Sequence, residues 1–142
     1  MQDLETLKLG GVGLSPSRWA LPPAGFVCLD VDASFYEENN RCRIGGVIRD
    51  FKGQPLAAFG QSILMSSFVV LRELFAILAG IEIIRERDIN RVVVSSDSLL
   101  TVQAVTESNG DLSYVGLCAS EINSLISVID GASICHIKRS AN

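Results

Sequence analysis

The chain has 142 residues, the size of one domain, and its 48% apolar and 20% charged residues exclude an intrinsically disordered chain. The net charge of −4 argues against a basic protein that binds nucleic acid through many phosphate contacts. It does not exclude an enzyme that meets nucleic acid through bound metal ions, because the ions supply the positive charge.

Residues 1–24 differ in composition from the rest of the chain. They include Gly10-Gly11, Pro22-Pro23 and further Gly and Ser residues, which fit poorly in regular elements. We predict a tail or linker there and one folded domain over residues 25–142.

Three strands are predicted at the start of the domain, over residues 26–34, 42–49 and 55–62. In the first, side-chain alternation places Val27, Leu29 and Val31 on one face and Cys28, Asp30 and Asp32 on the other. Gly53 supplies the positive φ of a hairpin loop between the last two strands, so the three strands form an antiparallel meander.

Helices and strands alternate in the second half of the chain, where apolar residues recur at helical spacing and then in short runs. Together with the meander, this order predicts an α/β domain with a mixed sheet. The expected elements are a helix from Ser66 or Ser67 to Arg87, a strand over 91–95, a helix from Asp97-Ser98 to the break at Asn109-Gly110, a helix over 117–129 and a strand over 133–137.

Three carboxylates occupy positions where a catalytic or metal-binding site could form. Asp32 lies at the end of the first strand, and Asp97 directly follows the fourth, where the ligand crevice of an open α/β sheet lies. Glu73 lies in the early turns of the long helix, and the small residues Ala76 and Gly80 follow it on the same face. Close packing of this helix on the sheet could bring the three carboxylates together.

A cluster of three carboxylates is strained by repulsion unless a divalent cation neutralises it. Oxygen ligands suit Mg²⁺ or Mn²⁺, and two such ions can clamp the attacking water and the leaving oxygen of a phosphodiester. Each residue also has a simpler interpretation. Asp97 could cap a helix, Glu73 could be solvated, and Asp32 could merely end a strand. Asp30 is either a solvent-facing strand residue or an accessory carboxylate.

The cysteines and the chain start indicate the compartment. Cys28, Cys42, Cys118 and Cys135 form no C-x-x-C pair, and His136 is the only histidine, so a structural zinc site is disfavoured. We expect buried, reduced thiols in an intracellular protein of the nucleus or the cytoplasm. No signal peptide or membrane-spanning stretch is visible in the sequence.

Several short motifs occur in a familiar order along most of the chain. They are Trp-Ala-Leu-Pro-Pro-Ala-Gly at 19–25, Cys-Leu-Asp-Val-Asp-Ala-Ser at 28–34, Gly-Gly-Val-Ile-Arg-Asp-Phe-Lys-Gly at 45–53, Glu-Leu-Phe-Ala-Ile-Leu-Ala-Gly-Ile at 73–81, Val-Ser-Ser-Asp-Ser at 94–98 and His-Ile-Lys-Arg-Ser-Ala-Asn at 136–142. With these motifs the sequence resembles the ribonuclease H superfamily. It is most similar to the plant ribonuclease H-like domains related to the reverse transcriptases of retroelements.

The resemblance implies a ribonuclease H-like fold, a five-stranded mixed sheet of order 3-2-1-4-5 with helices on both faces. It also implies an endonuclease that hydrolyses the RNA strand of RNA–DNA hybrids with two Mg²⁺ (or Mn²⁺) ions. Asp32, Glu73 and Asp97 match three of the family's metal-binding carboxylates. The fourth, an Asp in a final helix, would come three residues after the position of Asn142, so we expect a C-terminally truncated domain.

The sequence departs from the family pattern at several positions. Ala33 replaces the Gly after the first catalytic Asp, Asp30 the usual Asn, and Cys28 the usual Lys. His136 lies on the strand that precedes the loop where the family's best-known enzymes carry a mobile catalytic His. We therefore interpret His136 as a buried or edge-strand histidine.

Two functions of different classes remain open at this point. One is the metal-dependent endonuclease, a monomer with an RNA–DNA hybrid as partner and no membrane contact. The other is a catalytically decayed, domesticated module that binds nucleic acid or protein. Arg41, Arg43 and Arg49 could contact a phosphate backbone, or they could simply be solvated. A fragment that does not fold stably is a third possibility, because loss of the final helix would expose apolar surface.

Overall fold

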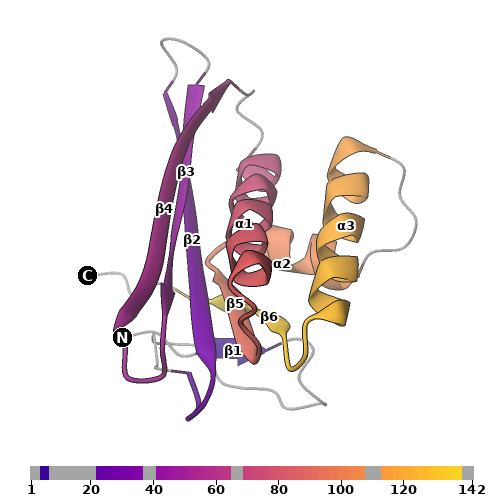
Figure 1. Ribbon diagram of the computed structural model, residues 1–142. Helices are drawn as coiled ribbons and strands as arrows, with labels where there is room; N and C mark the ends of the chain where they lie inside the picture. Colours follow the sequence, from indigo (N-terminus) through magenta and orange to yellow (C-terminus); the bar gives the residue numbers. More distant parts are fainter. Residues whose placement is uncertain (1–3, 7–21, 37–40, 65–68, 108–112, 139–142) are drawn as a thin grey trace.

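One mixed sheet and three helices account for the residues that the computed structural model describes, which are 4–6, 22–36, 41–64, 69–107 and 113–138 (Figure 1). The strands are β1 (Leu4–Thr6), β2 (Val27–Tyr36), β3 (Arg41–Arg49), β4 (Pro55–Leu64), β5 (Val92–Ser96) and β6 (Ser133–Ile137). The helices are α1 (Val69–Glu86), α2 (Leu99–Thr106) and α3 (Tyr114–Val128).

The strand order across the sheet is β1-β6-β5-β2-β3-β4. Strands β2, β3 and β4 pair antiparallel, whereas β5 pairs parallel with both β2 and β6. The five strands from β2 to β6 therefore have the predicted order 3-2-1-4-5, and the α/β ribonuclease H-like fold class is confirmed. A sixth strand, β1, pairs antiparallel with β6. It lies within residues 1–24, where the sequence predicted a tail or linker without a strand.

The hairpin between β3 and β4 forms as the sequence predicts. Gly53 has a φ of 86°, which L-residues rarely adopt. The Asp50 carboxylate accepts hydrogen bonds from the backbone N–H groups of Lys52 and Gln54, each at 2.9 Å. These bonds hold the loop in one conformation and fix the β3–β4 register.

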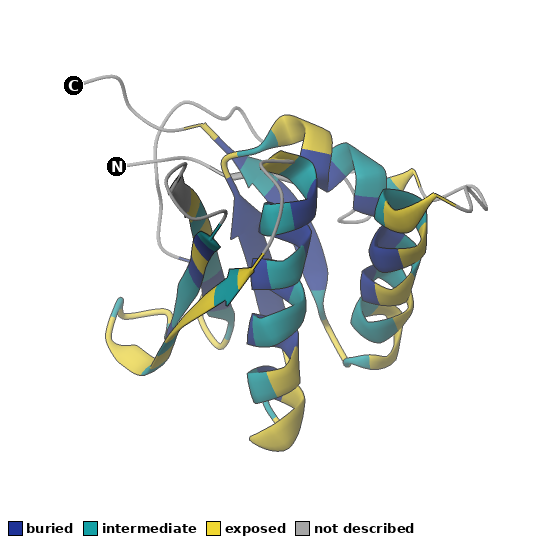
Figure 2. Cartoon of the chain, turned by 90° about the horizontal axis from the view of Figure 1, so that it is seen from above, coloured by how far each residue is buried: buried dark blue, intermediate teal, exposed yellow. Residues whose placement is uncertain are grey.

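Side chains on one face of the sheet form the main core. Leu29 lies in register with Ile48 of β3 and Val94 of β5, and Val94 lies in register with Ile134 of β6. All four are buried in one cluster with the inner faces of the helices. Figure 2 shows this buried layer between the sheet and the helices.

The three described helices all pack on this same face (Figures 1 and 2). The expectation of helices on both faces is therefore wrong for the described residues. The opposite face holds a smaller buried cluster of Val93, Cys135 and Ile137, against which Phe26 packs. None of the helices in the described ranges is long and apolar enough to cross a membrane.

Helix boundaries differ from the prediction where capping residues decide them. Helix α3 begins at Tyr114, earlier than the predicted residue 117, because the Ser113 side chain accepts a hydrogen bond from the Gly116 N–H at 3.1 Å. The caps predicted at Ser66 or Ser67 lie outside the described residues.

Helix α1 approaches β2 closely at a glycine. A Cβ atom built on Gly80 would lie 2.6 Å from Cδ2 and 2.7 Å from Cδ1 of Leu29. Leu29 is fully buried, so a shift of its side chain would disturb the core around it. The small residue at position 80 therefore sets the distance between α1 and the sheet.

Replacement of Gly80 by valine should lower the free energy of unfolding by about 1–3 kcal/mol, because the added methyl groups overpack the contact with Leu29. Chemical denaturation followed by circular dichroism measures this change. Glu82→Val is the matched control, because Glu82 is exposed on the same helix and loses at most about 0.7 kcal/mol of helix propensity. Equal losses in the two variants would contradict the close-packing argument.

Candidate active site

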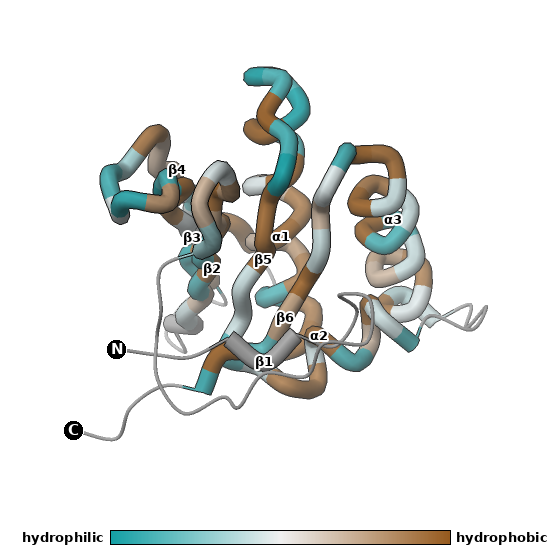
Figure 3. The backbone as a smooth tube through the Cα atoms, turned by 90° about the horizontal axis from the view of Figure 1, so that it is seen from below, coloured by the Kyte–Doolittle hydropathy of each residue, from teal (hydrophilic) through white to brown (hydrophobic). Residues whose placement is uncertain are grey.

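Two neighbouring parallel strands bring Asp32 and Asp97 to the same level of the sheet. Asp32 lies inside β2, four residues before the end of the strand at Tyr36, which corrects the prediction that it ends the strand. Asp30 of β2 pairs with Ser95 of β5, and each aspartate lies two positions beyond this pair. Neighbouring strands are about 4.8 Å apart. Strand β5 also changes from apolar to polar residues toward this end (Figure 3). Asp97 therefore lies where open α/β sheets bind their ligands, directly after the carboxyl end of β5, and Asp32 lies at the same level on β2.

Glu73 reaches the same level from α1. The helix runs antiparallel to β2 (Figure 1), and Gly80 marks the point where it lies over Leu29. Glu73 precedes Gly80 by seven residues, about 10.5 Å along the helix axis. That distance corresponds to about three strand residues, which leads from Leu29 to the level of Asp32. Glu73 is only 5% exposed.

The three carboxylates approach the edge from different sides. Asp32 follows the alternation of Cys28 and Asp30, so its exposed side chain lies on the face away from α1, and its Oδ1 accepts a hydrogen bond from the Ala33 N–H at 2.9 Å. Glu73 comes from the helix on the other face. In the part of the chain that the structure describes, no three His, Cys, Asp or Glu side chains lie close enough to hold one metal ion.

The donor set suits a hard divalent cation even though the side chains do not converge as placed here. All three candidates offer carboxylate oxygens, which Mg²⁺ and Mn²⁺ prefer. Asp32 and Asp97 are exposed on the surface. The position of Glu73, in contrast, is fixed by the packing of α1. The backbone therefore brings the three donors to one level of the sheet, and a metal site would require the two aspartates to turn.

The cap of α2 decides between the two interpretations of Asp97. Ser98 is the N-cap residue, and its Oγ accepts hydrogen bonds from the Thr101 N–H at 3.2 Å and from the Thr101 Oγ1 at 2.8 Å. The preceding Ser96 Oγ accepts one from the Ser98 N–H at 3.1 Å. The N-cap residue is therefore Ser98 and not Asp97, which is exposed directly after the end of β5.

A group of buried thiols lies on the sheet face that α1 does not cover. The Ser95 Oγ lies 3.2 Å from the Cys28 Sγ and 3.7 Å from the Cys135 Sγ. Burial raises the pKa of both thiols to about 12, and the half-buried Asp30 adds to the rise in each. All four cysteines are free and buried, as the sequence predicted. Asp30 is therefore neither fully solvated nor directed at Glu73.

His136 is half-buried in β6, in register with Ser96 of β5. On the other side of β6, Glu5 of β1 pairs with it. His136 is thus in a strand with neighbours on both sides, which corrects the prediction of a buried or edge-strand histidine.

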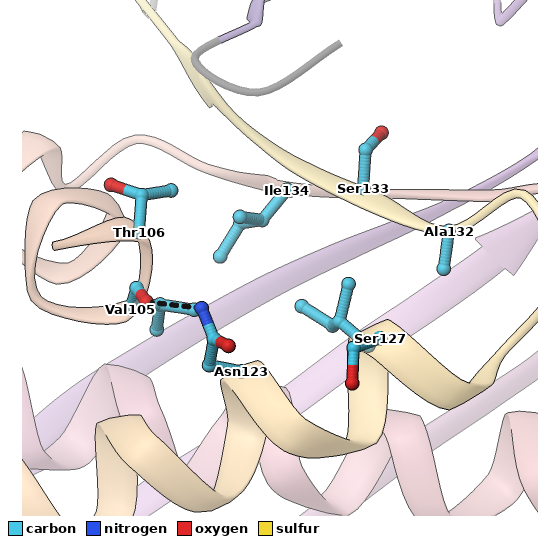
Figure 4. A pocket seen from close by; sticks show the side chains of 8 residues that line it. Val105, Thr106, Asn123, Ser127, Ala132, Ser133 and Ile134 are labelled. Carbon is cyan, nitrogen blue, oxygen red and sulfur yellow. Dashed lines mark hydrogen bonds between the residues drawn. The ribbon is translucent and has the colours of Figure 1, made fainter. Parts of the chain in front are cut away.

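A small cavity of about 150 Å³ lies between α2, α3 and β6, away from the carboxylates (Figure 4). The Asn123 Nδ2 donates a hydrogen bond to the Val105 carbonyl at 2.8 Å beside it. Ser133 and Ile134 at the amino end of β6 line the cavity, whereas Asp97 follows the carboxyl end of β5. The residues that line the cavity include no acid or base.

Comparison with known proteins identifies the family. Residues 30–142 match the reverse transcriptase-like family, and this stretch contains Asp32, Glu73 and Asp97. The chain belongs to the reverse transcriptase-like family. No curated protein matches the chain.

Solved structures share the fold of this reverse transcriptase-like domain. RNase H1 from the halophilic archaeon Halobacterium salinarum NRC-1 gives a TM-score of 0.66 at 19% identity, over 80% of this chain and 86% of that chain. LC11-RNase H1 was isolated from compost by a metagenomic approach and crystallised in complex with an RNA/DNA hybrid. The complex gives a TM-score of 0.66 at 19% identity, over 79% of this chain and 85% of that chain. The N-terminal RNase H domain of Rv2228c from Mycobacterium tuberculosis gives 0.60 at 18% identity, over 82% of each chain.

Removal of the α2 cap should destabilise the reverse transcriptase-like domain more than neutralisation of the neighbouring aspartate does. Ser98→Ala should lower the free energy of unfolding by about 1 kcal/mol, the usual effect of a lost N-cap hydrogen bond. Asp97→Asn should lower it by less, because this variant keeps the cap and loses only a negative charge near the helix N-terminus. Urea titration of both variants measures the difference, and a loss in Asp97→Asn as large as in Ser98→Ala would show that Asp97 has a capping role.

The buried thiols should make the domain sensitive to alkali. The folded-state pKa of Cys28 and Cys135 is about 12 against an ordinary value of 9.0, so the unfolded chain releases these protons first. Their contribution to the free energy of unfolding is therefore constant below pH 9 and falls as the pH rises from 9 toward 12. Urea titrations between pH 8 and 11 measure this slope. The double variant Cys28→Ala/Cys135→Ala should have a shallower slope, and an unchanged slope would contradict the prediction.

Proposed function

We propose that this domain is a ribonuclease H-type endonuclease that hydrolyses the RNA strand of RNA–DNA hybrids, with Asp32, Glu73 and Asp97 as the residues that hold Mg²⁺ or Mn²⁺. The observation that carries the proposal is that the three residues lie at one level of the sheet. Asp32 and Asp97 come from neighbouring parallel strands, each two positions beyond the Asp30–Ser95 pair, and the close packing of α1 carries Glu73 to that level. The shared fold with an enzyme crystallised with an RNA/DNA hybrid supports this choice of substrate.

The three residues would divide the work by their surroundings. Glu73 is buried and would act as the fixed ligand, whereas Asp32 and Asp97 are exposed and would turn toward the bound ions. When two ions are bound, they supply the positive charge that neutralises the carboxylates and activates water for attack on the phosphodiester. A chain with net charge −4 needs that positive charge to accept a polyanion at an acidic site.

The buried free thiols support a reducing compartment, the nucleus or the cytoplasm, as the place of action. Such a location fits a domain related to the reverse transcriptases of retroelements, whose hybrids form inside cells.

A labelled RNA–DNA hybrid incubated with Mg²⁺ or Mn²⁺ tests the proposal. We expect cleavage of the RNA strand alone, and a rate reduced at least about 100-fold in Asp32→Asn and Asp97→Asn, because a lost metal ligand removes several kcal/mol of transition-state stabilisation. Both residues are exposed, so the variants should fold. Calorimetric titration with Mn²⁺ provides a second readout, in which each variant should bind the ion more weakly than the parent chain.

If the folded chain binds the hybrid but cleaves it with neither Mg²⁺ nor Mn²⁺, the proposal that it is an endonuclease is wrong. That result would favour the module that binds nucleic acid without catalysis. Cleavage that persists in Asp32→Asn would place the reaction elsewhere.

A further inference from the structure

The half of the sheet formed by β2, β3 and β4 exposes the face that the helices do not cover. On β3, the buried Cys42 and Ile44 point to the helices, so Arg43 between them points to the open face. Arg43 lies in register with Ser34 of β2 and Ser62 of β4, and all three are exposed. This row is a continuous polar strip across three strands.

The next row toward the carboxylates has almost no side chains. Asp32 lies in register with Gly45, and Gly45 with Gly60. A Cβ atom at Gly60 would have no heavy atom within 4 Å, and one at Gly45 would meet the Phe59 carbonyl oxygen at 3.0 Å. The surface beside Asp32 is therefore bare backbone, which a ligand can approach closely.

Two arginines border the surface formed by Gly45 and Gly60, which we call the glycine floor. Arg43 and Asp32 are diagonal neighbours on paired strands, with Cα atoms about 7–8 Å apart, so a long guanidinium side chain reaches over the floor. Arg41 lies one side-chain repeat farther on the same face, and its Nε donates a hydrogen bond to the Ser62 Oγ at 3.2 Å. That bond orients Arg41 across the strip. The planar guanidinium group suits bidentate contact with phosphate oxygens.

We infer that the phosphate backbone of a nucleic-acid strand lies across the Gly45–Gly60 floor, with Arg43 bound to a phosphate beside the one presented to Asp32 and Arg41 bound to a further phosphate. The inference takes its substrate class from the proposed function. Arg43 is then a positioning residue, since it contacts the strand but not the reacting atoms. Its contacts go to phosphates, so they fix register and carry no base specificity.

The test measures hybrid binding in the Asp32→Asn background, where turnover is blocked. Fluorescence anisotropy gives Kd at several salt concentrations. Arg43→Ala and Arg41→Ala should each weaken binding and reduce the slope of log Kd against log salt by about 0.7–0.9, the value for one lost phosphate contact. Arg43→Lys keeps the charge and should keep most of the slope. Arg85→Ala is the matched control, because it removes an exposed arginine at the far end of α1.

The outcomes separate this inference from the proposed function. In one outcome, the chain with Asp32 cleaves the hybrid, but Arg43→Ala and Arg85→Ala give the same Kd and the same salt slope. The proposed endonuclease activity is then supported, and the inferred phosphate contact of Arg43 is wrong. If no cleavage occurs but the slope depends on Arg43, the strip stands as a nucleic-acid surface and the enzyme fails. Absence of any hybrid binding overturns both. Equal thermal stability of the arginine variants excludes a merely structural effect.

Discussion

The distance between α1 and β2 at the Gly80–Leu29 contact is the constraint on which the rest of the molecule depends. Because no Cβ intervenes, the helix lies close to the sheet, and Ala76, Ile77 and Ile81 enter the core with it. The same approach buries Glu73 beside the strand ends. The packing that stabilises the domain and the placement of its buried carboxylate are therefore one arrangement, and a change that loosens the first displaces the second.

Much of the fold could be predicted because periodicity is a local signal. Alternation in β2 gave the correct faces for Leu29 and Asp32, but strand neighbours are set by tertiary pairing, so their order came from the family resemblance. Strand β1 has only three residues, which is too short for a periodic signal. The run Val92–Val94 is apolar on both faces of β5, and such a run is typical of a strand covered by helices on both sides. That pattern could not show that the described helices cover only one face of the sheet.

The sequence indicated the candidate carboxylates, but not how their side chains are arranged. Asp97 and Ser98 are both good N-cap residues, so only the hydrogen bonds of Ser98 distinguish them. Glu73 stands between apolar neighbours in the sequence, and its burial follows from the helix–sheet distance, which no local pattern contains. The arginines of β3 looked like ordinary solvated residues until the pairing with β2 and β4 placed Arg43 one row from Asp32.

The arrangement of Cys28 and Cys135 on either side of Ser95 has a consequence for oxidation. Because β5 lies between the two cysteine strands, their Cα atoms are separated by two strand spacings, about 10 Å or more. A disulfide needs Cα atoms within about 7 Å, so the folded chain cannot join this pair without breaking the sheet. The Ser95 hydroxyl group lies between the two sulfur atoms. Folding itself thus protects these two thiols from cross-linking, and a bond between them would report a chain that had been oxidised before its sheet was complete.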